Sequence, residues 1–446
     1  MLLFLLLLVT PGLFSGVSRA ASLVRLQDAM DLPEPPSIQS DYAILIEMKS
    51  GAILYEKNAL EKAYPASITK IMTALLTAEH CEMGESVTFS YRATHELQPG
   101  GSSIARTEDE VMTVEECLYG LLVASANEVA QALAEHVSGS LESFASLMTL
   151  RAYELGAVNT NFANSHGMHE ENHYTCAYDM ALIAREAFKH DKLVTIMGTE
   201  KYQIPPTNKH DEITYLQMRH PLLTKSADMK YPFALAGKTG YTEEALNTLV
   251  TYARQGDLDL IAVVMHGNGI PATGSDSIAL FNYGFQNYRS LSLSSAESVL
   301  QEGSSAFLSG NLLQLVNLEE DYCTLPRGMG LSDLYSQVVL GNEPEAGELA
   351  SRIYYIGGQE VARCRLTVAP AKEGIRLTPV ARVAPTQKEI LRQVHLGLPL
   401  IYWILIGGGV LLLILLLLAV WLIRRLLRSR QRRKEHAKRA LSRIAE

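Results

Sequence analysis

Residues 65–74 read Pro-Ala-Ser-Ile-Thr-Lys-Ile-Met-Thr-Ala and place Ser67 three positions before Lys70, at the start of a helical pattern. Apolar residues recur here at the spacing of one helix face: Ile68, Ile71, Met72, Leu75 and Leu76. Because positions three apart are neighbours on a helix, the hydroxyl and the amine are expected within reach of each other. The spacing therefore predicts a serine nucleophile with a lysine partner.

Two more short motifs follow in order along the chain, Ser-Ala-Asn at 125–127 and Lys-Thr-Gly at 238–240. Each alone is weak, since about one or two S-x-x-K matches are expected by chance in a chain of this length. The ordered set is far stronger, and the long gaps allow the three pieces to come from different elements. We expect them to converge on one serine acyl-transfer centre.

The chemistry of the first motif requires an unusual lysine. A serine hydroxyl is a poor nucleophile, so Ser67 needs a base, and Lys70 can act as one only when neutral. Lowering a lysine pKa from about 10.4 to near 7 costs roughly 4 to 5 kcal/mol. Burial and a second cation, Lys238, both act in that direction. Taken alone, the pair would be a capping serine and a solvated lysine.

The second and third motifs supply polar groups around this pair. Ser125 can relay a proton to a leaving amine, and the Asn127 amide can hold Lys70 and a substrate carbonyl at once. Taken alone, this motif would be an ordinary loop between helices. Lys238 and Thr239 offer a cation and a hydroxyl to a terminal carboxylate.

The third motif is expected at the end of a strand whose edge can pair with an extended peptide. Gly240 would then let the substrate backbone approach closely. The backbone N–H groups of Ser67 and Tyr241 would form an oxyanion hole.

The flanking residues resemble the serine-type D-alanyl-D-alanine carboxypeptidases, the low-molecular-mass penicillin-binding proteins. The resemblance covers residues 41–284 and rests on these segments: 64–74, 125–127, Glu154-Leu155-Gly156, Asn159-Thr160, His173-Tyr174, Asp179-Met180-Ala181 and 237–242. It implies that Ser67 is acylated by the D-Ala-D-Ala end of a peptidoglycan stem peptide and deacylated by water. It further implies sensitivity to β-lactam antibiotics, and no metal or organic cofactor.

The sequence departs from this family in three places. Glu128 stands where members commonly carry Asp, and Leu246-Asn247-Thr248 stands where they carry a Gly-aromatic-Cys run. Many members also end in an amphipathic helix rather than in an apolar span. The first two departures leave the catalytic groups intact and bear on the substrate fit.

Periodicity predicts an α+β fold, a helical cluster on an antiparallel sheet assembled from both chain ends, and the resemblance implies that this fold is of the penicillin-binding/β-lactamase-like type. A hairpin is expected from 43–47 and 51–55, and helices are expected to stop near Gly139 and Gly156. The predicted order is a signal peptide (1–20), a Pro-rich linker (21–40), the catalytic domain (41–289), a small all-β domain (290–369), a stalk (370–397), a transmembrane helix (398–423) and a basic cytoplasmic tail (424–446).

The two chain ends carry the localisation signals. Residues 1–16 are almost wholly apolar and lack a basic start, so an uncleaved anchor is the alternative to a signal peptide. Residues 398–423 carry no charge and are long enough to cross a bilayer. The basic flank that follows predicts a cytoplasmic tail and an extracytoplasmic catalytic domain in the cell membrane.

Charge argues against nucleic acid as a partner. The tail carries ten basic and two acidic residues, a net +8, so the rest of the chain carries −17 within the formal total of −9. Five cysteines are too few for a disulfide framework, although Cys323 and Cys364 could pair.

Residues 169–173 match the zinc-protease motif H-E-x-x-H, but they follow a turn-rich stretch, so a metal site is not favoured. Two further alternatives remain. A serine β-lactamase shares the three motifs and would use Glu170 or Glu171 for deacylation. A membrane-tethered scaffold with a degraded site would bind cell wall without catalysis.

Overall fold

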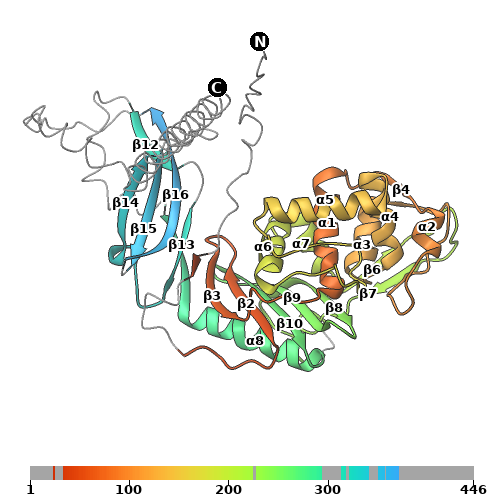
Figure 1. The fold of residues 1–446 in the computed structure, drawn as a ribbon, viewed down its shortest axis with the longest axis horizontal. Helices are drawn as coiled ribbons and strands as arrows, with labels where there is room; N and C mark the ends of the chain where they lie inside the picture. The colour runs from red at the N-terminus through yellow and green to blue at the C-terminus, as the bar shows by residue number, and fades with distance from the viewer. Residues whose placement is uncertain are drawn as a thin grey trace, which may run out of the picture. The chain divides into compact units, whose positions relative to one another are not determined.

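A computed structural model of the protein describes residues 24–25, 34–224, 228–293, 313–317, 321–340, 350–356 and 358–370. Its main sheet has the strand order β1-β3-β2-β10-β9-β8, antiparallel except for the pair β1–β3. The strands are β1 (Val24–Arg25), β2 (Tyr42–Glu47), β3 (Ala52–Lys57), β8 (Ala234–Thr242), β9 (Leu246–Gln255) and β10 (Leu258–Gly267). Because β10 pairs with β2, early and late segments share one sheet, as predicted (Figure 1).

The main sheet is covered on both faces, which β2 shows through its alternation. Ile44 and Ile46 belong to the core shared with the helical cluster, whereas Ala43 and Leu45 belong to the core beneath α8 (Ile270–Asn287). Successive strand residues point to opposite faces, so a strand buried on both sides is apolar at every position. Figure 1 shows α8 on the opposite side of the sheet from the cluster.

The helical cluster supplies the first two motifs. Its elements are the 3₁₀ turn η1 (Ala66–Thr69) and α1 (Lys70–His80), α2 (Tyr91–His95), α3 (Val114–Leu122), α4 (Asn127–Ser138), α5 (Leu141–Glu154), α6 (Ala177–Ala187) and α7 (Asp191–Met197). Thr113 and Glu116 form a capping box at the start of α3. Gly139 ends α4 at φ 78°, in the left-handed conformation that favours glycine, as predicted.

The strand that carries the third motif is longer than the sequence indicated. The third motif was expected at the end of a strand, but β8 continues beyond it through Thr242. Its partner β9 pairs along nearly the whole length, with Lys238 opposite Val250 and Gly240 opposite Thr248. Backbone pairing thus holds polar residues in a strand that apolar periodicity alone does not reveal.

Two short ladders flank the helices, β4 (Ser86–Thr88) with β5 (Val111–Thr113) and β6 (Lys201–Ile204) with β7 (Thr214–Gln217). After α8 the described residues are mostly strands. β11 (Tyr288–Ser292) pairs with β13 (Tyr322–Pro326), and a second sheet has the order β12-β16-β15-β14. The remaining elements there are β12 (Leu313–Asn317), the 3₁₀ turn η4 (Leu331–Asp333), β14 (Tyr335–Leu340), β15 (Ala350–Ile356) and β16 (Gln359–Pro370).

Residues 21–40 are more than the linker that the prolines indicated. Ile38 is buried, and the backbone N–H groups of Gln39 and Ser40 both donate to the Asp276 carboxylate on α8. The β1 strand also lies inside this range. The folded structure therefore begins before Asp41.

The structure has all five cysteines as free thiols, so the suggested Cys323–Cys364 pair is not formed. Among the described residues, no helix is long and apolar enough to cross a membrane. The predicted signal peptide, transmembrane helix and tail lie outside the described residues, and so does the predicted stalk apart from Pro370, which ends β16.

Candidate active site

The nucleophile and its partner lie where a 3₁₀ turn becomes a helix. Ser67 is in η1 and Lys70 begins α1, with Lys70 Nζ 3.1 Å from Ser67 Oγ. The turn is held from outside, because Thr248 Oγ1 donates to the Pro65 carbonyl at 2.9 Å. A Cβ on Gly167 would lie 1.9 Å from the Ala66 carbonyl oxygen, so that position requires glycine.

Lys70 is fully buried, and its amine has three oxygen partners. Besides Ser67, Nζ donates to Asn127 Oδ1 and to the His166 carbonyl, each at 2.7 Å. Burial holds the pKa of Lys70 well below its usual value, nearby Lys238 lowers it further, and Glu128 acts in the opposite direction. Burial and Lys238 thus both favour the neutral form of the amine, which is the form that can act as a base.

Ser125 and Lys238 form the other half of the site. Lys238 Nζ donates to Ser125 Oγ at 3.0 Å and to the Thr239 carbonyl at 2.8 Å. Burial lowers the pKa of Lys238 to about 7. Ser125 has φ 63°, a strained conformation for a residue with a side chain, which directs it between the helices and β8. The three motifs thus converge as predicted.

The third motif lies on an open sheet edge. Within the described residues β8 is the last strand of its sheet, and Tyr241 is 60 % exposed. A Cβ on Gly240 would lie 2.8 Å from the Ser67 amide nitrogen and 2.4 Å from Thr248 Oγ1. Gly240 therefore makes room for the protein's own nucleophile turn, a reason that differs from the substrate approach expected from sequence.

The departure at Glu128 has a structural explanation. Its carboxylate is buried and Oε1 accepts from Ser103 Oγ at 2.8 Å and from the Ile104 N–H at 2.6 Å. The Asn127 N–H donates to the Ser102 carbonyl at 2.8 Å. These bonds fasten the 101–105 loop to the start of α4, so Glu128 supports the site from behind.

The departure at Thr248 is explained by its bond to Pro65. Its hydroxyl connects β9 to the segment that precedes the nucleophile. Sequence reasoning missed this role, and it also missed the His166 carbonyl and Gly167. The one available signal was the turn-rich stretch 164–167.

The H-E-x-x-H match is not a helix; residues 169–173 lie in turns and irregular chain. His173 Nδ1 accepts from the Ala163 N–H at 3.0 Å, and its Nε2 lies 2.8 Å from Thr69 Oγ1. His169 instead packs edge-on against Tyr64. Because both nitrogens of His173 have protein partners, this residue braces the nucleophile turn.

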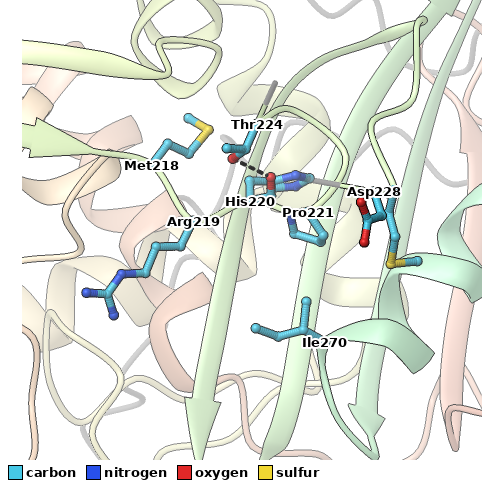
Figure 2. A pocket seen from close by; sticks show the side chains of 8 residues that line it. Met218, Arg219, His220, Pro221, Thr224, Asp228 and Ile270 are labelled. Carbon is cyan, nitrogen blue, oxygen red and sulfur yellow. Dashed lines mark hydrogen bonds between the residues drawn. The ribbon is translucent and has the colours of Figure 1, made fainter. Parts of the chain in front are cut away.

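A cavity of about 290 Å³ lies beside β8 (Figure 2). Its lining residues are Met218, Arg219, His220, Pro221, Thr224, Asp228, Met229 and Ile270. His220 is buried, which lowers its pKa to about 4, and its Nε2 would lie 2.3 Å from a Cβ on Gly237. None of the predicted site residues lines this cavity.

The fold and the site have the residue types and arrangement of the penicillin-recognising serine acyl-transferases, with a buried lysine in contact with a serine beside an open strand edge. Comparisons with known proteins support this class. The D-alanyl-D-alanine carboxypeptidase family, peptidase S11, matches residues 29–269, and the chain belongs to it.

Similar proteins include D-alanyl-D-alanine carboxypeptidase DacF of Bacillus subtilis, 38% identical over 250 residues, which are 55% of this chain and 62% of DacF. DacC of Escherichia coli, also named a D-alanyl-D-alanine carboxypeptidase, is 32% identical over 321 residues, 70% of this chain and 77% of DacC. The structure of penicillin binding protein 5 from Haemophilus influenzae matches with TM-score 0.62 and 26% identity, covering 75% of this chain and 98% of that one. The match thus spans less than two thirds of DacF.

Proposed function

We propose that this chain is a penicillin-sensitive D-alanyl-D-alanine carboxypeptidase that trims peptidoglycan pentapeptides in cell-wall maturation. The observation that supports this most directly is the buried amine of Lys70, 3.1 Å from Ser67 Oγ and held by Asn127 and His166. A scaffold with a degraded site would have no reason to keep a costly buried lysine beside a serine.

In acylation, neutral Lys70 takes the Ser67 hydroxyl proton while Oγ attacks the carbonyl carbon of the penultimate D-alanine. The backbone N–H groups of Ser67 and Tyr241 would stabilise the oxyanion. The peptide C–N bond then breaks, and the leaving amine receives a proton through Ser125, which Lys238 contacts at 3.0 Å. The products are an ester on Ser67 and free D-alanine.

In deacylation, water attacks the ester carbonyl and gives a proton to Lys70, and the Ser67 oxygen leaves and regains a proton. The stem peptide is released one residue shorter.

Substrate binding precedes both steps. Lys238 and Thr239 would bind the substrate's terminal carboxylate, and the β8 edge would pair with its extended backbone. A β-lactam would follow the first step and stop at the ester.

The test is fluorescent penicillin labelling of wild type beside Ser67→Ala, with D-alanine release from a pentapeptide measured in parallel. We expect Ser67→Ala to lose both. Labelling that survives the substitution would sink the assignment of the nucleophile.

The same experiment separates the alternatives. Rapid hydrolysis of the penicillin adduct would favour a β-lactamase, in which Glu170 would assist water. Glu170 instead accepts a hydrogen bond from Asn164 Nδ2 at 2.8 Å. Cell-wall binding without D-alanine release would favour the scaffold.

We also propose that the chain is a single-pass membrane protein with its catalytic domain outside the cell membrane and its tail inside. The support is the uncharged stretch 398–423 and the basic flank after it. Protease treatment of intact cells should remove the catalytic domain and leave a protected C-terminal fragment. A chain extracted from membranes by alkali alone would contradict the span.

A further inference from the structure

Three metal-ligating side chains of different types meet on the surface away from the catalytic centre. Cys81 Sγ, a Glu85 carboxylate oxygen and a His136 ring nitrogen all lie within 4.8 Å of one another. Cys81 directly follows α1, Glu85 directly precedes β4, and His136 is in the last turn of α4. Three separate elements therefore contribute one ligand each.

We propose that Cys81, Glu85 and His136 bind a borderline-soft divalent cation of the zinc type. Thiolate, imidazole and carboxylate are the three side-chain ligands that Zn²⁺ takes in proteins. Hard cations such as Mg²⁺ and Ca²⁺ prefer oxygen sets, so the thiol selects against them. With three protein ligands, the fourth position of a tetrahedron belongs to water.

The present spacing is close to what such a site needs. Metal–ligand bonds of about 2.0 to 2.3 Å in a tetrahedron put neighbouring ligand atoms about 3.3 to 3.6 Å apart. His136 Nε2 already lies 3.1 Å from Glu85 Oε2. The other carboxylate oxygen, Oε1, accepts from the Glu82 N–H at 2.5 Å, which orients the group.

Access from solvent is favourable, whereas burial and Glu85 raise the pKa of the Cys81 thiol, so the cation has to displace its proton. The Glu85 and His136 side chains are 43% and 24% exposed, and Cys81 is half-buried, so a cation can enter from solvent. On binding, the thiol releases its proton to water, and His136 carries its hydrogen on Nδ1 so that Nε2 is free for the metal. No redox step is involved.

The consequence is a clamp between two helices that both begin in the catalytic centre. Lys70 starts α1 and Asn127 starts α4, and the proposed ligands lie at the other ends. Eleven helical residues separate Lys70 from Cys81 by about 16 Å, too far for the cation to touch the reacting atoms. It would stabilise the fold and leave basal acylation unchanged.

The test is a Zn²⁺ titration of the untagged full-length chain in detergent, against a chromogenic chelator. We expect one Zn²⁺ per chain and a melting temperature raised by about 5 °C or more at a hundredfold excess over Kd. Co²⁺ in place of Zn²⁺ should give a thiolate charge-transfer band.

Variants locate the cation. Cys81→Ser and His136→Gln should weaken Zn²⁺ binding at least about 100-fold, and Glu85→Gln at least about 10-fold. The matched control is His190→Gln, because His190 is a helix-start residue whose side chain makes no capping bond. Penicillin labelling of Ser67 should be unchanged in all four.

Three results would overturn the proposal. One is the absence of Zn²⁺ binding to the wild-type chain, and another is unchanged affinity in Cys81→Ser. The third is binding that disappears in His169→Gln but persists in Cys81→Ser, which would place the metal at residues 169–173 instead.

Discussion

The catalytic centre has two halves that differ in how firmly they are held. On the helix half, Lys70 is fully buried and joined to Ser67, Asn127 and the His166 carbonyl. On the strand half, Lys238 bonds Ser125 and its own neighbour's carbonyl on an edge strand. Under the proposed mechanism, the difference teaches that the nucleophile and its base belong to the rigid half. The strand half offers an unpaired edge that can accept a peptide, beside the proton relay Ser125.

The strongest way to break this comparison is Lys70→Gln. Without a base, the acylation rate of Ser67 by penicillin should fall about 10²- to 10⁴-fold. Stopped-flow labelling measures it, with exposed Lys189→Gln as the matched control. A rate within threefold of wild type would mean that the helix half does not supply the base.

The second test uses buried neutral histidines in both halves. Burial lowers the pKa of His166 and of His173 to about 3 on the helix half, and that of His220 to about 4 on the strand half. Below about pH 6.5 these histidines take up protons in the unfolded chain but stay neutral in the folded chain. The free energy of unfolding therefore falls as pH falls. For each histidine the free energy of unfolding falls by about 1.4 kcal/mol at pH 5.5, and for the three together it falls by at most about 4 kcal/mol.

Denaturant titrations at pH 7.5 and 5.5 measure this loss. Burial raises the pKa of Glu47 and of Asp179, which acts in the opposite direction. In His220→Asn, the part of this loss of unfolding free energy that comes from the histidines should be about a third smaller. A free energy of unfolding that does not fall between these pH values would show that the histidines are not held neutral.

The third test addresses the strand half. Lys238→Gln should lower kcat/KM for a pentapeptide about 10- to 100-fold, because the substitution removes a charge-assisted bond to the terminal carboxylate. Exposed Lys230→Gln is the control. For a peptide amidated at its C-terminus the loss should be smaller, because only the effects of Lys238 on the pKa of Lys70 and on Ser125 remain. An equal loss on both peptides would give Lys238 a role other than carboxylate binding.

The smallest expected effect tests the electrostatic action of Glu128 on the pKa of Lys70. Glu128 raises the pKa of Lys70, against the effects of burial and Lys238. Glu128→Gln can keep the Oε1 bonds to Ser103 and Ile104 while removing the charge. The acidic limb of the pH–acylation profile should then move to lower pH. A shift to higher pH would contradict this electrostatic role.

Local patterns predicted much of the fold and the main site residues. The hairpin expected at 43–55 became β2 and β3, because its apolar runs and turn are encoded in a dozen consecutive residues. The Gly139 stop was correct for the same reason. The length of β8 was not predictable from its own residues, because pairing with β9 determines it.

The supporting contacts were less accessible to sequence reasoning. Thr248 to Pro65, and His166 to Lys70, join residues that are far apart in the chain. Every residue type has a backbone carbonyl, so no motif could predict that the His166 carbonyl is the third partner of Lys70. The same holds for the meeting of Cys81, Glu85 and His136.

The sequence alone determined which groups are candidates for the chemistry, since two serines, two lysines and an asparagine stand in ordered motifs whose types the proposed reaction demands. The tertiary structure decided how those groups behave. Burial of Lys70 beside Lys238 lowers its pKa, and this effect exists only when α1, α4 and β8 come together. Desolvation and distance are properties of the packed chain, and no single segment possesses them.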